Sequence, residues 1–110
     1  INNAEAFFFF FFFYFDSISY KSEVTQRFTY YNTSIHSLYI KTIISTCGCT
    51  KPIWSDKSIA PNEQGEIFIK VISDRLGSFK QSAVVYYNGQ NSPDTLSIEG
   101  YVFYPIAVKE

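Results

Sequence analysis

The sequence predicts an all-β fold, an antiparallel β-sandwich of about seven short strands. Aromatic residues make up 20% of the 110-residue chain, and isoleucine, valine and threonine are plentiful. This composition favours pleated, half-buried strands over helices. Several segments also alternate apolar and polar residues with a period of two, and turn-forming residues separate these segments. A chain of this length is long enough for one domain with an ordinary hydrophobic core.

The charged residues are balanced and dispersed. Nine basic and ten acidic side chains leave a formal net charge of -1, and no block of like charges is present. Phosphate backbones and anionic membrane surfaces attract clustered positive charge. The sequence therefore predicts no nucleic-acid partner.

The earliest expected strand is a nine-residue aromatic run at 7–15. As a helix this run would be roughly 13 Å long, too short to cross a ~30 Å hydrocarbon core, so we expect no transmembrane segment. In a strand, alternate rings face opposite sides, so the inward rings would complete the core while the outward rings need cover. The run begins with seven consecutive phenylalanines, Phe7, Phe8, Phe9, Phe10, Phe11, Phe12 and Phe13.

An uncharged, proline-free aromatic strand at a sheet edge is prone to pair with another chain. We therefore interpret the run as an edge strand and as a candidate contact strand for self-association, for another protein or for a neighbouring domain. Two alternatives stay open, a poorly ordered or processed segment and a tract without a selected role.

Later segments carry the remaining strand signals. Polar or glycine-containing turns at 32–34, 61–65, 74–77 and 88–89 separate them. The consecutive Ile43 and Ile44 interrupt the alternation and predict a bulge or bend. The expected strands lie at 23–31, 38–44, around 58–59, 67–71, 79–87 and 96–102. Their inward rows predict a core formed by Phe28, Leu38, Ile40, Ile69, Val71, Val85, Leu96, Ile98 and Val102.

Residues 47–50 read Cys-Gly-Cys-Thr and contain the only two cysteines of the chain. Two Cα atoms at this spacing in a straight strand lie roughly 6.6 Å apart, near the outer limit for a disulfide, and a bend at Gly48 would bring them closer. A redox dithiol, a soft-metal clamp, a small disulfide and a pair of packing residues all remain open. We expect the pair at a strand end, without catalytic turnover and with Trp54 packed nearby. The motif of possible function comprises Cys47, Gly48, Cys49, Thr50 and Trp54.

Other candidate chemistry is incomplete in the sequence. A structural zinc site needs four ligands, and beyond the two cysteines the chain offers one histidine, His36, with Asp56 as a candidate carboxylate. We interpret His36 as a solvated turn residue. No nucleophile-elbow motif places a serine beside a base. The chain is therefore expected to be non-enzymatic, with no catalytic residue, no cofactor and no metal.

The ordered set of residues resembles the bacterial domain of unknown function 1573 family. The pattern includes Cys-Gly-Cys-Thr-Lys-Pro-Ile-Trp at 47–54, Ile-Ala-Pro-Asn-Glu-Gln-Gly-Glu at 59–66 and Leu-Ser-Ile-Glu-Gly-Tyr-Val at 96–102. The resemblance covers roughly residues 15 to 102. At 14–18 the chain reads Tyr-Phe-Asp-Ser-Ile, where the family usually has a glycine-containing Asp-Phe-Gly-Thr-Ile-like segment.

The resemblance implies an immunoglobulin-like sandwich in an extracytoplasmic setting, which means the periplasm, an outer-membrane lipoprotein or a secreted protein. It implies no established activity. We accordingly expect a non-enzymatic binding or structural module of a bacterial envelope or secreted protein. The alternative is a thiol-based redox or soft-metal-binding domain centred on Cys47 and Cys49. The expected organisation is an N-terminal linker at 1–6, the sandwich domain at 7–104 and a C-terminal tail at 105–110.

Overall fold

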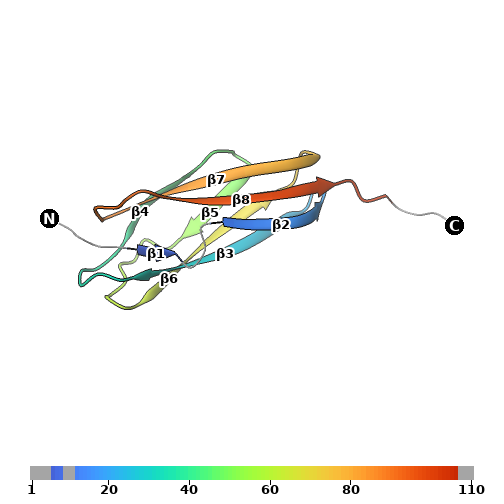
Figure 1. Ribbon diagram of the computed structural model, residues 1–110. Helices are drawn as coiled ribbons and strands as arrows, with labels where there is room; N and C mark the ends of the chain where they lie inside the picture. Colours follow the sequence, from blue (N-terminus) through green and yellow to red (C-terminus); the bar gives the residue numbers. More distant parts are fainter. Residues whose placement is uncertain (1–5, 9–11, 107–110) are drawn as a thin grey trace.

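A computed structural model describes residues 6–8 and 12–106, with side chains from Phe12 onward. These residues form eight strands (Figure 1). Within these ranges no helix is long and apolar enough to span a membrane. The strands are β1 (Ala6–Phe8), β2 (Phe12–Ser19), β3 (Glu23–Asn32), β4 (Ile40–Ser45), β5 (Thr50–Trp54), β6 (Gln64–Ile72), β7 (Gly77–Tyr87) and β8 (Asp94–Phe103).

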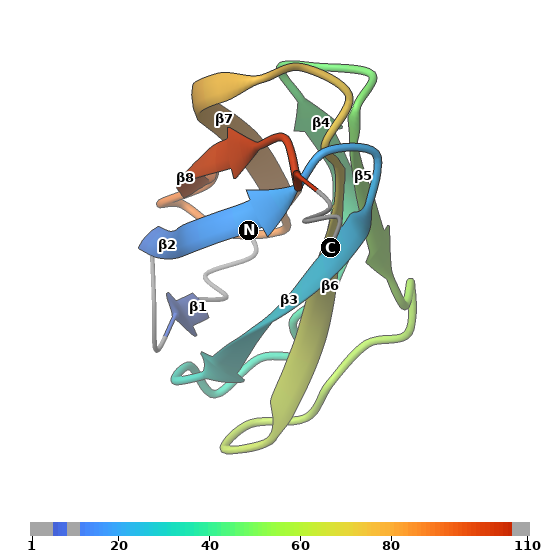
Figure 2. The same ribbon diagram turned by 90° about the vertical axis from the view of Figure 1, so that its right-hand side faces the viewer.

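The strands form two four-stranded sheets, with the orders β1-β3-β6-β5 and β2-β8-β7-β4. The two sheets face each other as layers, and Figure 2 shows β2 and β8 in one layer with β3 and β6 in the other. Paired strands are antiparallel except for β2 and β8, which run parallel. The predicted all-β sandwich is confirmed. The parallel pair is a feature that the sequence did not predict.

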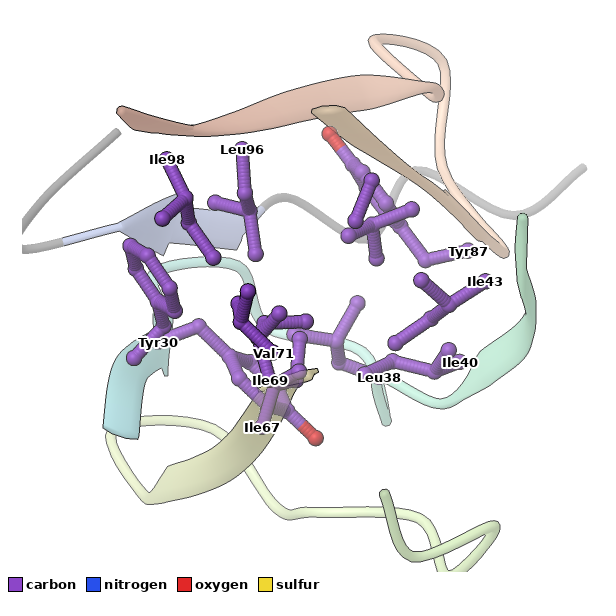
Figure 3. Packing of buried hydrophobic residues seen from close by; sticks show 13 residues of the cluster. Tyr30, Leu38, Ile40, Ile43, Ile67, Ile69, Val71, Tyr87, Leu96 and Ile98 are labelled. Atoms are coloured by element: carbon purple, nitrogen blue, oxygen red, sulfur yellow. The ribbon is translucent and has the colours of Figure 1, made fainter. Parts of the chain in front are cut away.

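The hydrophobic core lies between the two sheets, where side chains from both layers meet (Figure 3). In β6, for example, Ile67, Ile69 and Val71 face inward because alternate residues of a strand share a face. Burying each such side chain contributes about 1.5 to 3 kcal/mol. All nine residues predicted for the core are buried, namely Phe28, Leu38, Ile40, Ile69, Val71, Val85, Leu96, Ile98 and Val102.

The aromatic run does not form the single edge strand that we predicted over 7–15. Its β1 part pairs with β3 in one sheet, whereas its β2 part pairs with β8 in the other. Each part lies at the edge of its sheet. Phe9, Phe10 and Phe11 lie outside the described residues. A run of identical rings has no period of its own, so the strands it meets determine its pairing.

Within β2 the rings alternate as expected for a strand. Phe13 and Phe15 pack against the core with ring centroids 4.7 Å apart, while Phe12 and Tyr14 face outward. The register shifts between Phe15 and Ile18, which turns the buried Ile18 to the core side as well. β2 therefore contributes core residues beyond the aromatic run.

Most turn predictions correspond to bends in the structure. Asn62 and Gly77, both in predicted turns, have φ angles of 68° and 100°, which glycine and asparagine adopt more readily than other residues. The expected irregularity before the cysteines is present, although it lies between Ile40 and Thr42. Ile59 makes only an isolated bridge with Leu38 and does not belong to a strand. Ala6, assigned to the linker from sequence, begins β1, and residues 107–110 of the expected tail lie outside the description.

Candidate functional site

The cysteine motif forms the connection between β4 and β5, at the point where the chain passes from one sheet to the other. Cys47 and Cys49 form a disulfide, with their Cα atoms 5.1 Å apart. This distance is shorter than a straight strand allows, so the backbone bends at Gly48. Among the four alternatives, the structure contains the small disulfide. In this form the two sulfurs are bonded to each other and present no thiolate pair to a soft metal.

Hydrogen bonds hold the disulfide loop in place independently of the sulfur bond. The Thr50 amide donates to the Cys47 carbonyl over 3.0 Å, and the Ile72 amide of β6 donates to the Cys49 carbonyl over 2.9 Å. The Ser45 hydroxyl donates to the Thr50 carbonyl over 2.8 Å. The Cys49 amide also points at the Cys47 sulfur, 3.1 Å away. The loop is thus positioned by the end of β4, by β5 and by β6 together.

A small cavity lies beneath the disulfide, between the ends of the two sheets. Its volume is about 70 Å³, and Val71, Phe79 and Val102 form its apolar wall, with Asp74 and Arg75 also lining it. Sites for organic ligands usually enclose roughly 300 to 1,000 Å³. This cavity has room for a few water molecules only. The cavity beside the disulfide is therefore too small for an organic cofactor.

Trp54 does not pack over the cysteine loop, in contrast to our prediction. In the pairing of β5 with β6, Thr50 lies opposite Val71 and Trp54 lies opposite Ile67. Four residues of strand place Trp54 roughly 13 Å further along the sheet than Thr50. The indole instead packs against the hydrophobic core at the other end of β5.

The residues considered for a metal site are not brought together. His36 is exposed in the loop before β4, whereas Cys47 follows the end of that strand. Asp56 is exposed just after β5, again at the end of the strand remote from the cysteines. The six residues of β4 span roughly 20 Å and separate His36 from the sulfurs, and the five residues of β5 span roughly 17 Å and separate Asp56 from them. The exposed position of His36 agrees with its interpretation as a turn residue.

The candidate contact strand is divided in the structure, with Phe7 and Phe8 in β1 and with Phe12 and Phe13 at the start of β2. Phe12 and Tyr14 are 47% and 52% exposed and point away from the core. The neighbouring β8 exposes Tyr101 and Phe103, and the Tyr104 ring beyond it lies 5.9 Å from the Tyr20 ring. We name Phe12, Tyr14, Tyr101, Phe103 and Tyr104 the aromatic patch.

A second surface feature, on the outer face of the sheet β1-β3-β6-β5, was missed by the sequence reasoning. A polar groove of about 630 Å³ lies over β3 and β6. A hollow of about 390 Å³ adjoins it over β5, and the two share Glu66 and Phe68. The signal in the sequence was Phe68 itself, a large apolar residue on the outward side of a strand whose inward row is Ile67, Ile69 and Val71. The groove is lined by Gln26, Arg27, Thr29, Tyr31, Gln64, Glu66 and Phe68.

Comparison with solved structures shows the fold. A protein of unknown function from Porphyromonas gingivalis W83 matches 90% of this chain with a TM-score of 0.79 at 8% identity, and the chain spans 47% of that protein. The seventh PapD-like domain of human CEP192, an ASH domain, matches 92% with a TM-score of 0.76 at 7% identity, over 87% of its own length. The VesB protease of Vibrio cholerae matches 91% with a TM-score of 0.60 at 14% identity, over 32% of its length.

The sandwich is therefore of the immunoglobulin-like type, as the sequence resemblance implied, and it resembles a PapD-like domain. No curated protein matches the chain in sequence. The profile of a protein family of unknown function matches residues 12–102, from the start of β2 almost to the end of β8. This match covers most of the chain and both cysteines. The chain belongs to the DUF1573 family.

Proposed function

We propose that this chain is a non-enzymatic binding module of a bacterial envelope or secreted protein, and that it contacts a protein partner or a neighbouring domain through the open edge of β2. The immunoglobulin-like sandwich of a family of unknown function supports a module without chemistry of its own. Two bacterial structures also support the proposal, because the part that matches this chain is about half or less of each. Such proportions suit a module carried beside other domains.

The observation that carries the proposal is the unpartnered side of β2. This strand pairs with β8 on one side, and none of the described strands pairs with its other side. Its residues include no proline or lysine, and Asp16 is its single charge. Edge strands of monomeric proteins commonly carry prolines, lysines and other charged residues, because these residues prevent pairing with another chain. β2 lacks most of this protection and is suited to accept an added strand.

The outward rings on β2 make its pairing favourable. Phe12 and Tyr14 are about half exposed, and a strand placed beside β2 would cover part of both. Full burial of one such ring contributes about 1.5 to 3 kcal/mol, so partial cover of two rings is sufficient to change an association constant by about tenfold or more. The rest of the aromatic patch on β8 extends this surface.

A second copy of the chain is a partner that is present in every sample, so self-association reports on the open edge. We expect sedimentation velocity to detect association of the full chain that increases with concentration. The double substitution Phe12→Lys and Tyr14→Lys should weaken it about tenfold or more because lysines on an edge repel an added strand. Both side chains point outward, so the melting temperature should change little.

The matched control is Ile44→Lys. Ile44 is 55% exposed, similar to Tyr14, but it lies on β4 at the opposite edge of the same sheet. The proposal requires that this variant associates like the unmodified chain. Equal loss of association in both variants would indicate nonspecific hydrophobic association rather than a contact at the β2 edge. No loss in the β2 variant would show that its edge is not the contact site.

A further inference from the structure

The groove on the outer face of the sheet β1-β3-β6-β5 has a regular arrangement. Three residues of β3 lie opposite three residues of β6, in the pairs Arg27 with Phe68, Thr29 with Glu66 and Tyr31 with Gln64. Thr29 has the shortest of these side chains and lies in the middle of its row. The surface is therefore depressed at Thr29, between longer neighbours, and this depression forms the groove. We name these six residues the outer groove. Figure 2 shows β3 and β6 side by side in the layer opposite β2 and β8.

Two aromatic side chains mark the ends of the outer groove. Tyr31 and Phe68 are both half-buried, so each ring is supported by its neighbours and still reaches solvent. Four residues along the strands and one strand spacing across place them roughly 14 Å apart. Flat apolar surfaces at this separation match the length of a short linear ligand better than a compact one.

Polar groups of both hydrogen-bonding types lie between the two rings. Arg27 donates to Glu66 over 3.4 Å, with 63% and 39% of their side chains exposed. An exposed ion pair of this kind adds little to stability, so its remaining donors and acceptors are available to a ligand. The Gln64 amide offers one acceptor and two donors, and the Thr29 hydroxyl offers both functions. The charges of Arg27 and Glu66 balance.

We infer that the outer groove binds an uncharged oligosaccharide. A sugar ring has an apolar face that can stack on an aromatic ring and a rim of hydroxyls that both donate and accept hydrogen bonds. The outer groove presents these complementary surfaces in one row, without the net charge that an acidic or phosphorylated ligand would require. Its volume of about 630 Å³ is also within the range of ligand sites.

The sheet itself argues against an extended peptide at this place. β6 is paired on both sides, with β3 and with β5, so its backbone groups are already used in the sheet. An added peptide strand needs an unpaired edge. A ligand of the outer groove must therefore be recognised by side chains alone, which suits a saccharide. This site lies on the sheet opposite the β2 edge, and the inference does not depend on the proposed function.

Titration calorimetry of the full chain with a linear tetrasaccharide measures ligand binding. Trp54, the only tryptophan of the chain, gives a second signal, because its indole packs against the core while the residue borders the hollow that shares Glu66 and Phe68 with the groove. We expect its fluorescence to change during the same titration. The probes are the neutral tetrasaccharides of β-1,4-linked glucose, α-1,4-linked glucose, β-1,4-linked xylose and β-1,4-linked N-acetylglucosamine. At least one should bind saturably, and calorimetry should give the same dissociation constant.

Variants then assign the binding to the outer groove. Phe68→Ala and Tyr31→Ala should each weaken binding about tenfold. Gln64→Ala and Glu66→Gln test the polar contacts and should weaken it several-fold. Gln64 and Glu66 lie on the outward face, so we expect their substitution to leave the fold intact. These two variants therefore still test the site if removal of a ring impairs folding. The matched control Tyr101→Ala removes an exposed ring from the outer face of the other sheet and should leave the affinity unchanged.

Four results would overturn the inference. The first is that none of the four tetrasaccharides binds. The second is that the Tyr101 variant loses as much affinity as the Phe68 variant, and the third is that all groove variants bind like the unmodified chain. Preferential binding of an acidic saccharide or a peptide at the same residues would also contradict an uncharged sugar as the ligand. Circular dichroism and melting of each variant separate loss of the site from loss of the fold.

Discussion

Replacing Asn32 with alanine is expected to lower the free energy of unfolding by about 2 to 4 kcal/mol. Asn32 ends β3, and although its side chain is polar it is only 1% exposed. Its amide nitrogen donates to the carbonyls of His36 and Ile59, over 2.6 and 3.2 Å. Its amide oxygen accepts from the backbone and hydroxyl of Ser34, over 3.0 and 2.7 Å. One side chain thus joins the loop before β4 to the segment after β5.

The magnitude follows from these four hydrogen bonds. Each contributes about 0.5 to 1.5 kcal/mol net, and a buried partner left without a hydrogen bond costs more. Ser34 and His36 are at least partly exposed, so in the alanine variant water can replace some of the lost partners. The expected loss is therefore in the lower half of the range that the four bonds would allow.

Urea unfolding followed by Trp54 fluorescence measures this loss, with the exposed Asn91→Ala as the matched control. Asn32→Asp separates hydrogen bonding from packing, because it keeps the size and the acceptor but places a carboxylate against two carbonyls. We expect it to be at least as destabilising as alanine. An Asn32→Asp variant as stable as the unmodified chain would refute the reasoning. So would an alanine variant that loses no more than the Asn91 control.

The disulfide and a carboxyl group give the remaining predictions. The Cys47→Ser, Cys49→Ser double variant should fold and lose only about 1 to 2 kcal/mol, because the closed loop is tiny and hydrogen bonds hold it. Urea unfolding measures the loss, and a reproducible dithiol-exchange activity that disappears in the variant would contradict a purely structural role. Burial raises the pKa of Asp94, and a hydrogen bond from Tyr87 partly offsets this rise. The pKa of Asp94 is higher in the folded state than its ordinary value of 3.8. The contribution of Asp94 to the free energy of unfolding is therefore fully present below pH 3.8, and it is lost as pH rises through the folded-state pKa. The stability of Asp94→Asn relative to the unmodified chain should therefore increase between about pH 3 and about pH 7, and a difference that does not vary with pH would contradict the assignment.

The sequence by itself determined the sandwich and most of its core. Alternation with a period of two is a local property, so the inward positions of Phe28, Ile69 and Val85 can be read without knowing which strands pair. The position of the cysteine motif at a strand end was also accessible, whereas the bend at Gly48 and the disulfide remained open until the structure showed them. The family was likewise accessible, because its motifs are ordered along the chain.

Tertiary structure alone decided which residues meet across strands. The aromatic run divides between two sheets because its uniform rings have no phase, and the available partners β3 and β8 set its pairing. Trp54 is remote from the cysteines because the register of β5 against β6 places it there. The outer groove likewise joins residues such as Thr29 and Glu66, which are far apart in sequence and opposite in the sheet. Register depends on contacts between distant segments, and a local pattern carries no information about those contacts.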